Sequence, residues 1–127
     1  MPAVFLDSSA LVKLVRLEPE TQALRAFLGE PRPAMLVSEL ALTEVGRAAR
    51  RVGADATDVL AECDVVLLRS QLLVRAVELE PVTLRTLDAI QLATALSLSP
   101  RIDAFVVYDD RLAAAATAHG LEVASPE

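Results

Sequence analysis

Short apolar runs and longer amphipathic stretches alternate along the whole chain. The apolar runs are rich in Val, Leu and Phe, and such runs separated by helical periodicity are typical of βαβ units and a mainly parallel sheet. The pattern predicts strands at residues 3–6, 35–38, 64–68 and 104–107, with a weaker fifth at 121–124. Because these runs are almost wholly apolar, we expect the strands to be buried on both faces.

Helical periodicity fills the segments between the predicted strands. It predicts helices at residues 9–16, 20–28, 40–51, 55–63, 70–79, 86–98 and 110–119. In the third helix, the apolar spacing predicts a buried stripe made of Ala41, Val45, Ala48 and Val52. The fold class is therefore α/β, and a chain of 127 residues suits a single domain, residues 1–127.

Composition sets limits on the core and on the cellular compartment. Hydrophobic residues make up 54% of the chain but aromatic residues only 3%, so the core is expected to be aliphatic and base stacking a minor source of nucleic-acid binding. The single cysteine, Cys63, is expected to be a buried free thiol in a reduced compartment. Asp7 and Lys13 interrupt the apolar N-terminal stretch, unlike a signal peptide, and we expect a cytoplasmic protein without a membrane span.

The net charge of −6 argues against a generic nucleic-acid binder, because such proteins are usually basic. The argument weakens if several acids are metal ligands, since each divalent ion returns two positive charges. Every basic residue except Lys13 is an arginine, which suits bidentate phosphate contacts. Arg47, Arg50 and Arg51 are candidates for such contacts, with a solvated basic face as the alternative.

Two aspartates stand directly after predicted strands. Asp7 follows the first strand and Asp109 follows the fourth, and ligands bind at the carboxyl ends of parallel strands. Each position also suits a helix N-cap. Because Asp109 and Asp110 are adjacent, we assign Asp110 to the cap of the last long helix and leave Asp109 to point across the sheet edge.

Two further acids lie near helix starts. Glu44 is about one turn into the helix after the second strand, and Asp88 is in the first turn of the helix that precedes the fourth. A surface ion pair with Arg47 is the alternative role for Glu44, and a favourable charge at the helix N-terminus is the alternative for Asp88. The apolar neighbours of Asp88 predict a largely buried carboxylate, which needs a cation partner.

Taken together, the four acids meet at one edge of the predicted sheet. Carboxylates at close range repel one another unless cations lie between them. An all-oxygen ligand set without His or Cys favours Mg²⁺ or Mn²⁺ over zinc. The sequence thus predicts a metal site made of Asp7, Glu44, Asp88 and Asp109.

Four segments resemble the PIN domain, and specifically the toxin subunits of VapBC toxin–antitoxin pairs. They are FLDSSALVKL, SELALTEVGRA, LRTLDAIQLATAL and FVVYDDRLAAAA, and the resemblance covers essentially the whole chain. It implies a three-layer α/β/α fold, a homodimer, a cognate VapB-like antitoxin that blocks the acidic site, and Mg²⁺-dependent endonucleolytic cleavage of RNA. It also implies metal-binding roles for the same four acids.

The chain departs from the family pattern at two positions. Val107 stands where the family commonly has Thr, and Gln91 stands where it often has His. Neither change removes a proposed ligand. Ser9 matches a small hydroxyl position of the family and could hold a metal-bound water or cap the helix.

Three other functions compete with this interpretation. A PIN-like module that binds antitoxin or RNA without cutting would be favoured by loss of an acid, and none is lost. A phosphotransfer receiver would need an acceptor Asp in mid-sequence and a Lys near the last strand, whereas the only lysine is Lys13. A haloacid-dehalogenase-type phosphatase would need Asp where Ser9 stands.

The mechanism we expect is in-line attack of water on a phosphodiester, with Asp7 or Asp88 orienting the water.

Overall fold

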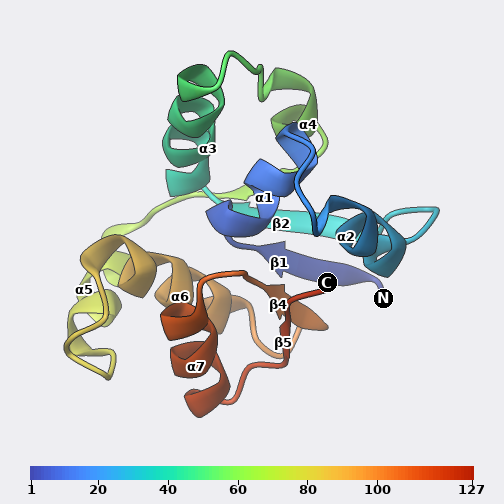
Figure 1. The fold of residues 1–127 in the computed structure, drawn as a ribbon. Coiled ribbons are helices and arrows are strands. Elements are labelled where there is room, and N and C mark those ends of the chain that lie inside the picture. The colour runs from blue at the N-terminus through green and yellow to red at the C-terminus, as the bar shows by residue number, and fades with distance from the viewer.

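A single parallel sheet runs through the computed structural model, which describes residues 1–127 (Figure 1). Its strands are β1 (Ala3–Leu6), β2 (Ala34–Ser38), β3 (Asp64–Val66), β4 (Ala104–Val106) and β5 (Val123–Ala124). The spatial order is β3-β2-β1-β4-β5, and every neighbouring pair is parallel. All five predicted strands are confirmed, with β3 and β5 two residues shorter than expected.

Seven helices connect the strands, as the periodicity predicts. They are α1 (Ser8–Val15), α2 (Thr21–Leu28), α3 (Leu40–Arg51), α4 (Thr57–Ala61), α5 (Ser70–Glu78), α6 (Thr86–Leu98) and α7 (Asp110–Ala118). The largest difference in bounds is at α4, which starts two residues later than expected. Asp55 accepts hydrogen bonds from the backbone N–H and the hydroxyl of Thr57, and this local turn holds the chain out of the helix.

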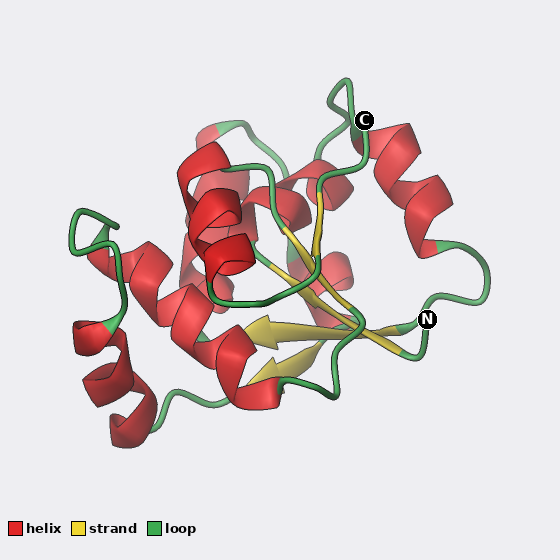
Figure 2. Cartoon of the chain, turned by 90° about the horizontal axis from the view of Figure 1, so that it is seen from below, coloured by secondary structure: helices red, strands yellow, loops and turns green.

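The helices cover both faces of the sheet and complete a three-layer α/β/α fold (Figures 1 and 2). Alternate residues of β1 face opposite ways. Val4 and Leu6 pack with buried residues of α1, α2 and α3, whereas Phe5 packs with α6 and α7. Phe5 also contacts Phe105 of β4, with ring centroids 5.5 Å apart. No helix is both long and apolar enough to cross a membrane.

Three burial predictions are wrong. Cys63 is a free thiol as expected, but it is half-buried rather than buried. The edge strands are not buried on both faces, because β3 and β5 each have a neighbour on one side only and Asp64 is exposed. The buried stripe of α3 contains Ala41, Val45 and Ala49 rather than Ala48 and Val52. The helix ends at Arg51, so Val52 leaves the helical register and is 45% exposed.

The strand order reverses beside β1, and this positions the site. The chain moves from β1 outward through β2 to β3, then crosses back through α5 and α6 to β4 on the other side of β1. A crevice at the carboxyl ends of such strands is the usual ligand site of open α/β sheets. Here the backbone N–H of Asp7 donates to the carbonyl of Val106 over 3.0 Å, which joins the two strand ends.

Candidate active site

Asp7 is the buried acid at the carboxyl end of β1. It is 5% exposed and is the N-cap of α1. Its Oδ2 atom accepts hydrogen bonds from the backbone N–H of Ser9 over 3.1 Å and from the Ser9 hydroxyl over 2.6 Å. The capping role weighed from the sequence is therefore confirmed, and the Oδ1 atom of Asp7 accepts no hydrogen bond from the protein.

Ser9 links this acid to the end of β4. While its hydroxyl donates to Asp7, the same oxygen accepts a hydrogen bond from the backbone N–H of Tyr108 over 2.9 Å. Tyr108 immediately precedes Asp109, the acid at the end of β4. Ser9 thus holds the ends of β1 and β4 in a fixed position relative to each other, and each of these strand ends leads to an acid of the site.

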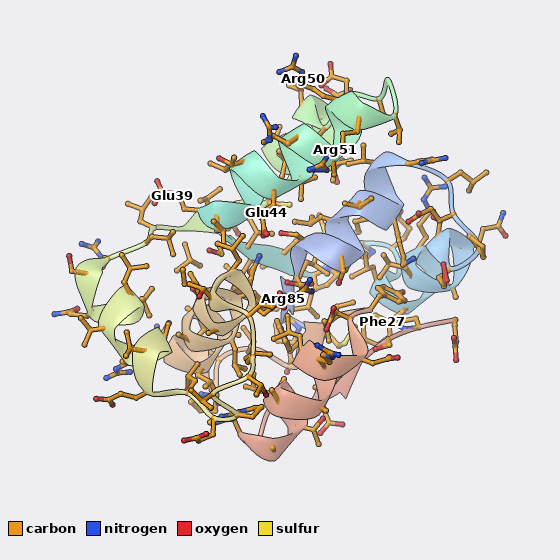
Figure 3. The ribbon with its side chains drawn as sticks, turned by 60° about the vertical axis from the view of Figure 1, so that its left-hand side comes forward. Phe27, Glu39, Glu44, Arg50, Arg51 and Arg85 are labelled. Carbon is orange, nitrogen blue, oxygen red and sulfur yellow. The ribbon has the colours of Figure 1, made fainter.

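Glu44 faces the same region from α3 (Figure 3). Its Oε1 atom accepts hydrogen bonds from the hydroxyl of Ser8 over 2.7 Å and from the amide nitrogen of Gln91 over 3.1 Å. Gln91 also donates to the Ser8 hydroxyl over 2.9 Å. No ion pair joins Glu44 to Arg47, so the surface salt bridge considered for this helix does not form.

Arg85 lies between the two remaining acids. Its Nε atom is 3.1 Å from Oδ2 of Asp88, and one of its terminal nitrogens is 3.2 Å from Oδ2 of Asp109. The Asp88 side chain is only 18% exposed, as its apolar neighbours predict, whereas that of Arg85 is 71% exposed. An exposed guanidinium therefore joins an acid of α6 to an acid that follows β4.

The N-cap of α7 is Asp109, and the assignment of Asp110 to this role is wrong. Oδ1 of Asp109 accepts a hydrogen bond from the backbone N–H of Leu112 over 2.8 Å, and Asp110 is the exposed first residue of the helix. The strand ends one residue earlier than expected, and the helix N-cap moves with it. Asp109 thus caps with one oxygen and directs the other toward Arg85.

The carboxylates act on one another electrostatically. Burial raises the pKa of Asp7 to about 6, and repulsion from Asp88 and Glu44 adds to this rise against the hydrogen bonds from Ser9. Burial also raises the pKa of Asp88, with Asp109 and Glu44 adding to the shift and Arg85 opposing it. The four predicted acids therefore share one electrostatic environment at the carboxyl edge of the sheet.

The donor chemistry of this edge fits a hard divalent cation. Its acidic side chains offer only oxygen atoms as ligands. The single positive charge of Arg85 balances only part of the negative charge of the four carboxylates. In the present arrangement, no group of three or more Asp, Glu, His or Cys side chains is set to hold a metal ion. Asp88 and Asp109 would have to leave Arg85 before three of these carboxylates could bind one ion.

Sequence reasoning missed the contacts made by Arg85, Ser8 and Gln91. Gln91 was noted only as a departure from the family pattern, yet it is 1% exposed and donates to Glu44. Arg85 could have been found, because it precedes Asp88 by three residues and pairs of that spacing meet on a helix surface. Ser8 gives no such signal, since its partners are 36 and 83 residues away.

Comparison with known proteins places the chain in a family. A model of the PIN domain matches residues 4–123. Ribonuclease VapC46 of Mycobacterium tuberculosis is 42% identical over 99% of both chains, and Ribonuclease VapC47 of the same species is 36% identical over 97% of this chain and 96% of its own.

Two solved structures share the fold at lower sequence identity. VapC20 of Mycobacterium tuberculosis, described as a sarcin-ricin loop cleaving toxin, has a TM-score of 0.72 and 17% identity, covering 93% of this chain and 95% of its own. A chain of a toxin–antitoxin complex from Klebsiella pneumoniae has a TM-score of 0.72 and 20% identity, covering 98% of each. On the family match and the full-length relatives, the chain belongs to the PIN domain family and, within it, to the VapC group.

Proposed function

We propose that this chain is a VapC-type toxin that cleaves RNA endonucleolytically with the help of bound Mg²⁺ or Mn²⁺. The observation that carries the proposal is the grouping of Asp7, Glu44, Asp88 and Asp109 at the strand-order reversal beside β1. The full-length relatives named ribonucleases support the activity. All four acids are retained, which favours an active enzyme over a module that only binds antitoxin or RNA.

The four carboxylates are proposed to hold the metal. A bound Mg²⁺ or Mn²⁺ supplies a Lewis acid that neutralises phosphate charge and lowers the pKa of water. Asp7 is proposed to contribute the oxygen that Ser9 does not engage, and Asp88 and Asp109 contribute oxygens when Arg85 moves away. Burial, with repulsion from Asp88 and Glu44 added to it, raises the pKa of Asp7. This supports the role, because a bound cation would stabilise the ionised carboxylate.

The reaction proposed is in-line attack of water on a phosphodiester, with departure of the 3′ oxygen. Asp7 or Asp88 orients the attacking water, since both lie at the site with one oxygen free of short hydrogen bonds. Glu44 is held in place by Ser8 and Gln91, so its carboxylate keeps a fixed direction while substrate binds. Arg85, released from the acids, is positioned to contact a phosphate oxygen.

Two partner assignments accompany the proposal. A VapB-like antitoxin that blocks the acidic site is supported by the VapC relatives and by the structural neighbour from a toxin–antitoxin complex.

A homodimer is supported by an exposed apolar groove of about 400 Å³ between α5 and α6, where Val77 is 81% and Val82 is 85% exposed. Light scattering at micromolar concentration tests the dimer, and a strict monomer would contradict it. An RNA substrate makes the cytoplasm the proposed site of action.

The activity is tested by incubating the purified chain with total RNA in Mg²⁺ and mapping the new RNA ends. Discrete internal cuts that appear with Mg²⁺ are the expected result. The matched comparison is Asp88→Asn against Asp58→Asn, because Asp58 is an exposed acid on α4 away from the site. RNA that stays intact in Mg²⁺ and in Mn²⁺ would overturn the proposed activity.

A further inference from the structure

Three arginines gather on the outer half of α3. Arg47, Arg50 and Arg51 are exposed, and they alone line a surface hollow of about 310 Å³. Figure 3 shows Glu44 nearer the middle of the molecule and Arg50 and Arg51 at the far end of the same helix. The hollow is therefore built entirely from cations and begins next to the helix turn that carries Glu44.

None of these arginines has an acidic partner. The five ion pairs of the structure use Lys13, Arg32 and Arg85 as their cations. The one acid within reach along α3, Glu44, is engaged by Ser8 and Gln91 instead. Other exposed arginines of this chain are also unpaired, but Arg47, Arg50 and Arg51 cluster around one hollow. They therefore concentrate positive charge at one place on a chain with net charge −6, and such a place attracts anions.

The helix end accounts for only part of this arrangement. Cations are favoured in the last turn of a helix, which explains Arg50 and Arg51. It does not explain Arg47, which lies a turn earlier, nor the absence of neighbouring carboxylates. Glu44, Arg47 and Arg51 have the spacing of one helix face, so the cations continue outward from the acidic site along roughly 10 Å of helix.

We propose that Arg47, Arg50 and Arg51 form a phosphate-binding track that holds the RNA backbone beside the scissile bond. The inference rests on the proposed function and assigns part of its substrate site. One guanidinium group can donate two parallel hydrogen bonds to two oxygens of the same phosphate. Stacking offers little alternative, because Phe5 and Phe105 are fully buried and the chain has no Trp. The two remaining aromatic side chains are only half-buried, but Phe27 lies on α2 and the Tyr108 ring already has Lys13 Nζ 4.7 Å from its centroid. Binding through this track depends on charge and not on base sequence.

The test compares two triple variants in an Asp7→Asn background, in which we expect no cleavage of the RNA. The track variant is Arg47→Gln, Arg50→Gln and Arg51→Gln, and glutamine keeps good helix propensity. The control is Arg16→Gln, Arg25→Gln and Arg101→Gln, three exposed arginines outside the track that also lack ion pairs. Both lose the same charge. Circular dichroism and melting temperature verify the fold, and a track variant with three lysines keeps the charge if the glutamines disturb α3.

The measurement is fluorescence anisotropy of a labelled 12-nucleotide single-stranded RNA across a range of salt concentrations in Mg²⁺. The track variant is expected to bind about tenfold more weakly, and its slope of log affinity against log salt is expected to fall by about 2, since each phosphate contact contributes about 0.7. The control is expected to stay within about twofold of the parent. With Asp7 restored, the track variant should raise KM more than it lowers kcat.

Equal affinities and slopes for the track and control variants would overturn the inference. Unchanged RNA binding with loss of binding to a ten-residue polyglutamate peptide would also overturn it, in favour of an acidic protein partner. These results leave cleavage by the parent chain intact. A parent chain that neither binds nor cuts RNA would instead overturn the proposed function and the track together.

Discussion

The side-chain amide of Gln91 donates a hydrogen bond to Oε1 of Glu44 over 3.1 Å, across 47 positions of the sequence. The same nitrogen donates to Ser8, so one buried amide fixes two residues of the site. The Oε1 atom of Gln91 is buried without a hydrogen-bond partner. Burying an unpaired carbonyl lowers stability, so the position serves the site rather than the core.

Gln91→Leu is therefore expected to lower cleavage while leaving the free energy of unfolding within about 1 kcal/mol of the parent, because the leucine removes an unpaired polar atom. Glu44 loses a donor and its fixed direction, so the Mg²⁺ concentration for half-maximal activity should rise. Thr94→Val is the control, since Thr94 is buried on α6 but bonds only its own helix. Metal dependence equal to that of the control would contradict the positioning role.

Asp109 carries two roles that separate by substitution. Asp109→Asn keeps a good N-cap and removes the charge, so it should abolish most cleavage with little change in melting temperature. Asp109→Ala removes the cap as well and should cost about 0.5 to 2 kcal/mol of stability. Asp110→Ala, at an exposed position, should stay within about 0.5 kcal/mol and remain active. Loss of stability in Asp110→Ala but not in Asp109→Ala would contradict the observed cap.

Arg85→Ala is expected to tighten Mn²⁺ binding, because the guanidinium no longer competes for Asp88 and Asp109. The gain should be small, because the exposed guanidinium is screened by water and its ion pairs with the two acids are weak. Calorimetric titration with Mn²⁺ measures it, and Arg111→Ala is the control for losing a nearby exposed arginine. Weaker Mn²⁺ binding in Arg85→Ala would show that the arginine organises the acids instead of competing with the ion.

Asp7 makes stability depend on pH in a defined direction. Its pKa is raised to about 6 in the folded chain from an ordinary value of 3.8, so folding favours the protonated form. Stability is then highest below pH 4 with respect to this group and falls as pH rises from about 4 to 6, by roughly 3 kcal/mol at most.

Melting curves in EDTA provide the measurement for Asp7. Asp7→Asn should melt above the parent by a margin that grows between pH 4 and 6, because only the parent then has to bury an ionised carboxylate, near the charges of Asp88 and Glu44. Mg²⁺ should reduce that margin at pH 7 by binding the ionised parent. A margin that stays constant across this pH range would contradict the raised pKa of Asp7.

Local patterns predicted the parts of this protein that depend on neighbouring residues. The apolar runs that end at Leu6 and near Val106 placed Asp7 and Asp109 at one sheet edge, because parallel strands align their carboxyl ends. The bounds of α3 and α6 followed from periodicity alone. Errors arose where one residue of register mattered, as with Val52 and the Asp109 cap.

Contacts between segments that are distant in the sequence could not be predicted from the sequence. Gln91 meets Glu44 and Ser8 only because α6 and α3 approach the end of β1 from opposite faces of the sheet, and no local signal encodes that approach. The edge position of β3 likewise depends on strand order, not on its own composition. The acids of the site could be predicted from the sequence, whereas the groups that orient or neutralise them are known only from the fold.

The central claim is that these acids act through a divalent cation. The most direct measurement is the rate of cleavage of a labelled RNA after EDTA treatment, as Mg²⁺ is added back to the parent, Asp88→Asn and Asp58→Asn chains. We expect no cleavage in EDTA and recovery with Mg²⁺ in the parent and Asp58→Asn. Asp88→Asn should stay slower by more than about 100-fold, since metal stabilisation of the phosphate is worth several kcal/mol. Undiminished cleavage by the parent in excess EDTA, or a parental rate in Asp88→Asn, would contradict the account.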